Sequence, residues 1–135
     1  GGKYGSPLQA ASKKGLKEVA RLLLEGGADI NAQGGEYGNA LQAACIIGDK
    51  ELVKLLLERG ADVNVHGGKY GNALQAASYR GDKELVVLLL ERGADVNAQG
   101  GEYGSALQAA KSRKHEEIVM LLLERDANAN AHCCD

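Results

Sequence analysis

The chain has 135 residues, a formal net charge of −2 and a pI of about 5.9. This balance argues against a general nucleic-acid binder, because such proteins usually carry a basic surface. No apolar run is longer than Ile118 to Leu123, which is far shorter than the roughly 20 residues that a membrane-spanning helix needs, so a membrane partner is not expected either.

The cysteine content predicts the compartment. The chain has three cysteines, Cys45, Cys133 and Cys134, which are too few and too clustered for a secreted disulfide scaffold. We therefore expect a reducing, cytoplasmic setting.

A 33-residue unit recurs along the chain without insertion or deletion. The segments GGKYGSPLQAA, GGEYGNALQAA, GGKYGNALQAA and GGEYGSALQAA begin at Gly1, Gly34, Gly67 and Gly100. We treat residues 1–135 as a single domain with repeats 1–33, 34–66, 67–99 and 100–132, and residues 133–135 as the stub of a fifth. A period free of drift predicts an array of identical units, each stabilised by its neighbours.

Each repeat is expected to hold a glycine-rich turn followed by two short helices. In the second repeat the turn is residues 34–38, and Asn39 stands where it can cap the first helix. Gly48 is expected to end that helix, a second helix is expected over Lys50–Glu58, and Gly60 is its left-handed cap. Because helices this short are marginal alone, the stack must supply their stability.

The repeat resembles the ankyrin family over the whole chain. In the first repeat the resemblance is carried by Ser6-Pro7-Leu8-Gln9, Val19, Leu22-Leu23-Leu24 and Gly27-Ala28-Asp29-Ile30-Asn31-Ala32. It implies an all-α ankyrin-repeat solenoid of four stacked helix-turn-helix units joined by β-turn or hairpin loops. The family histidine is replaced by Gln9, Gln42, Gln75 and Gln108, which we expect to keep hydrogen bonding between repeats. The Gly-Gly-x-Tyr-Gly-Asn-Ala-Leu-Gln variant also resembles ankyrin tracts of large fungal proteins, many of the immune-receptor type.

The resemblance implies a non-catalytic protein-interaction module that binds through a concave surface of turn tips and first helices. The informative residues are those that differ between otherwise identical repeats. They are the pairs Lys13-Lys14, Ile46-Ile47, Tyr79-Arg80 and Ser112-Arg113. Apolar and cationic side chains with no acid among them predict a protein partner that is acidic and carries an apolar anchor. The alternative is that Ile46 and Ile47 are partly buried and the charges only aid solubility.

One tyrosine recurs in every turn, as Tyr4, Tyr37, Tyr70 and Tyr103. Tyr37 and Tyr70 are candidate partner contacts, although their invariance within the array favours a packing role. The residue before each tyrosine alternates in charge, as Lys3, Glu36, Lys69 and Glu102. This alternation predicts a solvated ladder of ion pairs, each worth about 0–1 kcal/mol.

No enzymatic, metal or cofactor site is predicted. The cluster His132-Cys133-Cys134-Asp135 has no companion pair that would complete a tetrahedral metal site. Cys45 is expected to pack in a small-residue position. The glycine pairs recur with the turns and do not form a phosphate-binding loop.

The two ends of the array differ in sequence. The first repeat looks internal and uncapped, whereas Lys114 and Asp126 replace glycines in the fourth. We therefore expect an adhesive N-terminal face and end-to-end self-association. Two alternative functions stay open. The uniform turns favour a self-associating structural solenoid or spacer, and the low divergence favours an engineered repeat scaffold, against which Cys133 and Cys134 argue.

Overall fold

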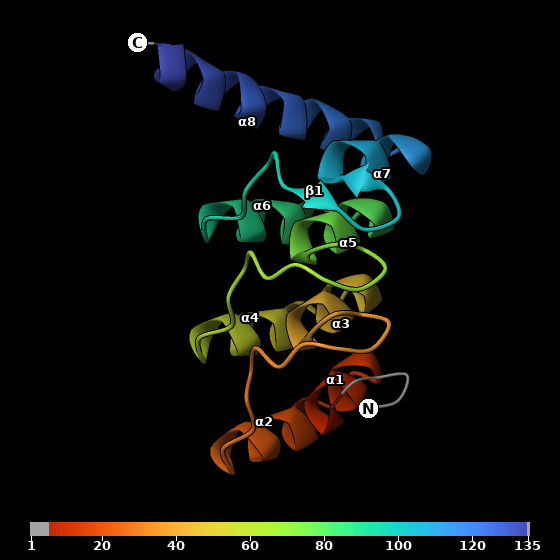
Figure 1. Ribbon diagram of the computed structural model, residues 1–135, viewed down its shortest axis with the longest axis vertical. Coiled ribbons are helices and arrows are strands. Elements are labelled where there is room, and N and C mark those ends of the chain that lie inside the picture. Colours follow the sequence, from red (N-terminus) through yellow and green to blue (C-terminus); the bar gives the residue numbers. More distant parts are fainter. Residues whose placement is uncertain (1–5, 135) are drawn as a thin grey trace.

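The computed structural model describes the backbone of residues 6–134 and the side chains of residues 6–126. Its helices stack in pairs along the long axis of the molecule (Figure 1). They are α1 (Pro7–Lys13), α2 (Lys17–Glu25), α3 (Ala40–Ile47), α4 (Lys50–Glu58), α5 (Ala73–Arg80), α6 (Lys83–Glu91), α7 (Ala106–Ser112) and α8 (Glu116–Cys134). The first helices α1, α3, α5 and α7 pack side by side, and each packs on the second helix of its own repeat. The architecture is the predicted all-α solenoid.

Side-chain caps fix where the helices begin. The first helices start after Ser6, Asn39, Asn72 and Ser105, whose side chains accept a backbone N–H at 2.8 to 3.2 Å. Asp49 and Asp82 cap α4 and α6 in the same way, at 3.1 and 3.2 Å. Leu16 stands at the corresponding position before α2 and makes no such bond. The caps predicted for the first helices are confirmed, and α2 begins without one.

The glycine-rich turns pack directly on one another. The Lys69 N–H donates to the Glu36 carbonyl and the Glu102 N–H donates to the Lys69 carbonyl, both at 2.8 Å. Gly68 has φ +72°, and a Cβ there would lie 2.5 Å from the backbone nitrogen of Gly38. Only glycine therefore allows the turns to approach this closely. The turn of the fourth repeat forms a short hairpin with strands of two residues each. In it, β1 (Gln99–Gly100) pairs antiparallel with β2 (Gly104–Ser105).

One rung of the predicted charge ladder lies within the described residues. Lys69 Nζ is 3.9 Å from a Glu102 carboxylate oxygen, and the two side chains are 37% and 59% exposed. Lys3 and Tyr4 lie outside the described residues, and so do the side chains of His132, Cys133 and Cys134 and the whole of Asp135.

Polar bonds also tie the loops that follow the second helices. Asn31 Oδ1 accepts the Asp62 N–H, and Asn64 Oδ1 accepts the Asp95 N–H, both at 2.8 Å. Gln9 Nε2 donates to the Ala32 carbonyl at 3.0 Å. This bond joins the first helix to the end of its own repeat, whereas we expected such glutamines to bond between repeats.

The core is aliphatic and continuous along the stack. Its fully buried leucines include Leu41, Leu52, Leu56, Leu74, Leu85 and Leu89. Cys45 is buried among them as predicted, and burial raises the pKa of its thiol well above the ordinary value. A thiol held protonated in this way is a packing residue rather than a nucleophile.

The fourth repeat departs from the other three. Gly27, Gly60 and Gly93 follow the second helices of repeats one to three with φ of 93° to 97°. Asp126 replaces this glycine, and α8 continues through it to Cys134. Lys114 replaces another glycine and adopts φ +61°, a conformation unfavourable for a residue with a Cβ. Among the described residues, no helix is long and apolar enough to cross a membrane.

Candidate functional site

The ends of α3, α5 and α7 meet around an open pocket of about 300 Å³. It is lined by Ile46, Tyr70, Tyr79, Arg80, Arg113 and His115, and we call it the tyrosine–arginine pocket. All of these except His115 are residues that the sequence singled out. The stacking therefore brings together variable residues from three repeats.

Three tyrosine rings support this pocket. The Tyr79 ring centroid lies 5.4 Å from that of Tyr70 and 4.8 Å from that of Tyr103. Tyr70 and Tyr103 are stacked, with centroids 6.3 Å apart. A side-chain hydrogen bond with Tyr79 raises the pKa of Tyr103, and burial is the main cause that raises the pKa of Tyr70. The phenols of Tyr70 and Tyr103 therefore stay neutral at physiological pH.

Cations lie against these rings and helix ends. The Arg113 guanidinium is 5.0 Å from the Tyr79 ring centroid, and Lys69 Nζ is 5.6 Å from that of Tyr70. Arg80 Nη1 donates to the Ile46 carbonyl at 3.0 Å. These contacts restrain the arginine side chains, so less conformational entropy is lost when they meet an anion.

His115 is a pocket residue that sequence reasoning missed. Its Nε2 is 3.0 Å from the Tyr79 carbonyl oxygen, to which it donates in the tautomer protonated at Nε2. The sequence does mark this residue, because His115 stands at the repeat position that the capping residues Asp49 and Asp82 hold in the two preceding repeats. Tyr103 was not among the predicted partner contacts, and its contact with Tyr79 joins the uniform turns to the variable helix ends.

Other predicted contact residues lie outside this pocket. Lys13 Nζ is 5.5 Å from the Tyr37 ring centroid, and Lys14 is exposed nearer the N-terminal end. Ile47 is half-buried and packs towards Gly15 of the preceding repeat, where an added Cβ would lie 3.5 Å from its Cδ1. Ile46 is also half-buried, and it lines the pocket.

The structure largely buries Tyr37 and Tyr70, two of the predicted contact residues. Their exposed fractions are 9% and 7%, and both belong to the hydrophobic core. Tyr70 lines the pocket, but it offers a partner little surface. The packing interpretation fits these rings, because an invariant ring in each turn is covered by the stack.

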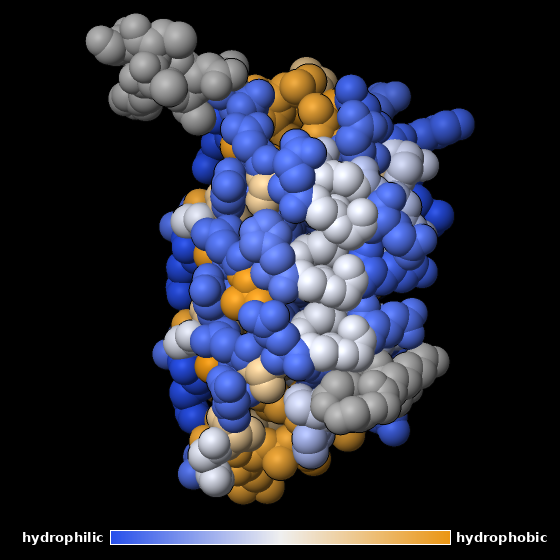
Figure 2. Space-filling view, in the orientation of Figure 1, coloured by the Kyte–Doolittle hydropathy of each residue, from blue (hydrophilic) through white to orange (hydrophobic). Residues whose placement is uncertain are grey.

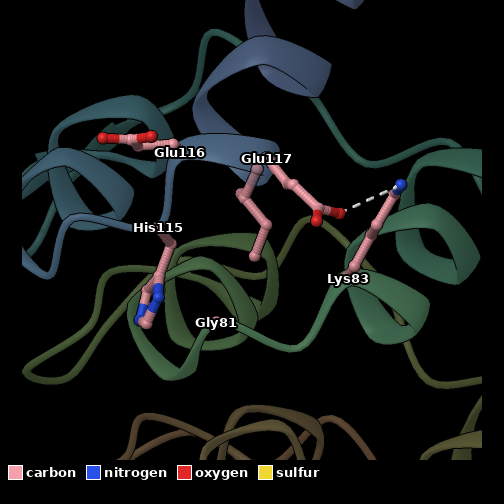
Figure 3. A pocket seen from close by; sticks show the side chains of 6 residues that line it. Gly81, Lys83, His115, Glu116 and Glu117 are labelled. Carbon is pink, nitrogen blue, oxygen red and sulfur yellow. Dashed lines mark hydrogen bonds and ion pairs between the residues drawn. The ribbon is translucent and has the colours of Figure 1, made fainter.

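A second pocket, of about 270 Å³, lies between the starts of α6 and α8 (Figure 3). It is lined by Gly81, Lys83, His115, Glu116, Glu117 and Ile118, and an ion pair of 3.3 Å joins Lys83 to Glu117. A similar pocket lies one repeat earlier, where Lys50 pairs with Glu84 at 3.6 Å. Recurrence with the repeat identifies these pockets as grooves between stacked second helices. No group of three or more metal-binding side chains is found among the described residues.

The comparisons with known proteins agree with this architecture. No curated protein sequence matches the chain. The family model described as ankyrin repeats (3 copies) matches residues 8–100 and, in a second match, residues 74–135. Together the two matches cover residues 8–135. The chain belongs to the ankyrin repeat family.

Proposed function

We propose that this chain is a non-catalytic module that binds an acidic, apolar-anchored segment of a protein partner at the tyrosine–arginine pocket and the adjoining first-helix ends. Ankyrin repeats are generally protein-interaction modules. One observation supports this partner and this binding surface. Ile46, Tyr79 and Arg113 come from three different repeats, and they line the same pocket.

The chemistry of the pocket supports an acidic partner. Arg80 and Arg113 present guanidinium groups beside an aromatic cluster, a combination enriched among residues that dominate binding energy. Guanidinium pairs with carboxylate in a bidentate geometry, which gives direction as well as attraction. Ile46 and the Tyr79 ring offer the apolar surface on which a leucine or aromatic anchor would pack.

The spacer alternative loses its main support. It rested on the uniform turns, and backbone bonds between turns and buried tyrosines account for that uniformity. These contacts do not account for the variation at the ends of the first helices, which binding of a partner would explain. The cytoplasmic location predicted from the cysteine content stays part of the proposal.

A peptide library selected on the immobilised chain tests this function. We expect enrichment of peptides with Asp or Glu beside a leucine or aromatic residue. Arg113→Ala should weaken binding of such a peptide by about tenfold, because it removes a charged contact worth roughly 1–2 kcal/mol.

Arg92→Ala is the matched control. Arg92 is also an exposed arginine, but it lies at the end of α6 and not on the pocket. It should leave affinity unchanged. Equal weakening by both variants, or enrichment of basic peptides, would contradict the proposed surface.

A further inference from the structure

Both arginines of the tyrosine–arginine pocket are exposed and have no carboxylate partner. The face of the stack in Figure 2 is mostly hydrophilic between its two ends, and acids outnumber bases in the chain by 18 to 16. Arg21 on a second helix pairs with Glu18 at 2.6 Å. Arg80 and Arg113 form no ion pair with any described residue, and the residues that line their pocket include no Asp or Glu.

Contacts with the protein hold both guanidinium groups and leave most of their donors unused. Arg80 Nη1 donates to the Ile46 carbonyl at 3.0 Å, and the same guanidinium lies over Gly48, where an added Cβ would overlap it. The Arg113 guanidinium lies 5.0 Å from the Tyr79 ring centroid, and its side chain makes no hydrogen bond to a described residue. Most donors of Arg80 and all donors of Arg113 are therefore available to a ligand.

A single carboxylate would use only part of this site. It accepts a bidentate pair of hydrogen bonds from one guanidinium and leaves the charge of the other unneutralised. A phosphate monoester carries a charge of about −1.5 to −2 at pH 7 and has three acceptor oxygens, so it can engage both guanidinium groups at once. His115 lines the same pocket, and in its protonated form it adds a further positive charge.

We propose that the acidic group recognised at the tyrosine–arginine pocket is the phosphate of a phosphorylated side chain in the partner's segment. This inference rests on the proposed function, in which the pocket binds an acidic, apolar-anchored segment. Arg80 and Arg113 bind the phosphate, and Ile46 and the Tyr79 ring contact the apolar part of the same segment. Phosphorylation of the partner would then control its binding.

A nucleic acid is a less suitable source of the phosphate. Its backbone presents a row of phosphates, and proteins that bind it spread cations along their surface. The lysines next to the pocket are already paired with acids, Lys69 with Glu102 at 3.9 Å and Lys83 with Glu117 at 3.3 Å. Two free guanidinium groups beside apolar side chains fit one modified residue of a protein better.

Fluorescence anisotropy with three peptide pools and the full chain tests the proposal. The pools share degenerate flanking positions that include leucine, and they differ only in a central phosphoserine, phosphotyrosine or glutamate. The tighter of the two phosphorylated pools should bind at least roughly tenfold more tightly than the glutamate pool. Inorganic phosphate or a single-stranded oligonucleotide that displaced the peptides at comparable concentration would identify another source of phosphate and overturn the choice of ligand.

Substitutions at Arg113 connect this preference to the pocket. Arg113→Lys keeps the charge and loses the bidentate geometry, so the preference for phosphate over glutamate should fall below about threefold. Arg113→Ala should have the same effect. Arg92→Ala is the matched control, because Arg92 is also exposed and unpaired among the described residues but lies outside the pocket. A preference that survived in both Arg113 variants would place the phosphate elsewhere and overturn the proposal.

The phosphate inference and the proposed function fail in different ways. If the glutamate and phosphorylated pools bound equally well, and both lost affinity in Arg113→Ala, the phosphate inference would be wrong and the proposed function would stand. If no pool bound the chain, both would be wrong. Far-UV circular dichroism of each variant should match that of the unchanged chain, because Arg113 and Arg92 are exposed.

Discussion

The two ends of this stack are built from the same repeat, yet they meet solvent with different surfaces. At the N-terminal end Leu16, Val19 and Leu22 are exposed in place of residues that internal repeats cover or use as polar caps. At the C-terminal end Lys111 places a charge at the position where Ser12, Cys45 and Ser78 are buried, and Glu116 reverses the charge that Lys17, Lys50 and Lys83 carry. Met120 and Leu123 keep that end partly apolar. The comparison shows that repeats of the same period can present different contact surfaces, because the residues at the contact positions differ.

The difference is energetic as well as compositional. An apolar face can be covered by an apolar neighbour with little desolvation cost, whereas a lysine must leave water to be covered. A charged residue at a contact position therefore opposes the packing of another repeat there. The fourth repeat has such a residue in Lys111.

The largest expected effect compares one helix position in two repeats. Leu52→Ala should destabilise the chain by about 2–5 kcal/mol, because it opens a cavity in a fully buried site. Val19→Ala, at the same position of the first repeat, should cost only about 0.5 kcal/mol. Urea unfolding of the two variants measures both. Losses of equal size would mean that Val19 is covered in solution.

A smaller effect concerns the helix cap missing at the N-terminal end. Leu16→Asp restores the residue found before α4 and α6, and it should stabilise the chain by about 1 kcal/mol. Asp49→Ala, which removes an existing cap, should lose a similar amount. The free energies of unfolding in denaturant give both values. If Leu16→Asp destabilised the chain, the leucine would already be making an apolar contact.

The smallest effect concerns the left-handed residue at the C-terminal end. Lys114→Gly should stabilise the chain by about 0.5 kcal/mol, since relief of the positive φ exceeds the entropy that glycine loses on folding. Lys111→Gly, within α7, is the control and should destabilise by roughly 0.5–1 kcal/mol. Thermal unfolding of the two variants would give shifts of opposite sign. Shifts of the same sign would show that the φ of Lys114 is not the source of strain.

Much of the fold was predictable because its signals are local. The cap at Asn39, the helix Lys50–Glu58 and the glycines after the helices depend on residues close together in the sequence. The site was predictable only in part. Tyr79 contacts Tyr103, and His115 lies 36 residues from the carbonyl that it approaches, so these contacts follow from the stacking geometry.

The fourth repeat shows a different limit. The replacement of glycine by Asp126 was visible in the sequence, but its consequence was not. Without a left-handed residue to end the helix, α8 continues to Cys134, whereas α2, α4 and α6 end before their glycines. A missing stop signal does not specify how far a helix extends, because packing and sequence further along decide it.

Sedimentation velocity over a dilution series tests most directly whether charge closes the C-terminal end. The chain itself should sediment as a monomer at every concentration. The double variant Lys111→Ser with Glu116→Lys, which restores the internal contact residues, should form head-to-tail oligomers that a further Val19→Glu substitution abolishes. Oligomers of the unchanged chain, or a double variant that stays monomeric, would contradict the account.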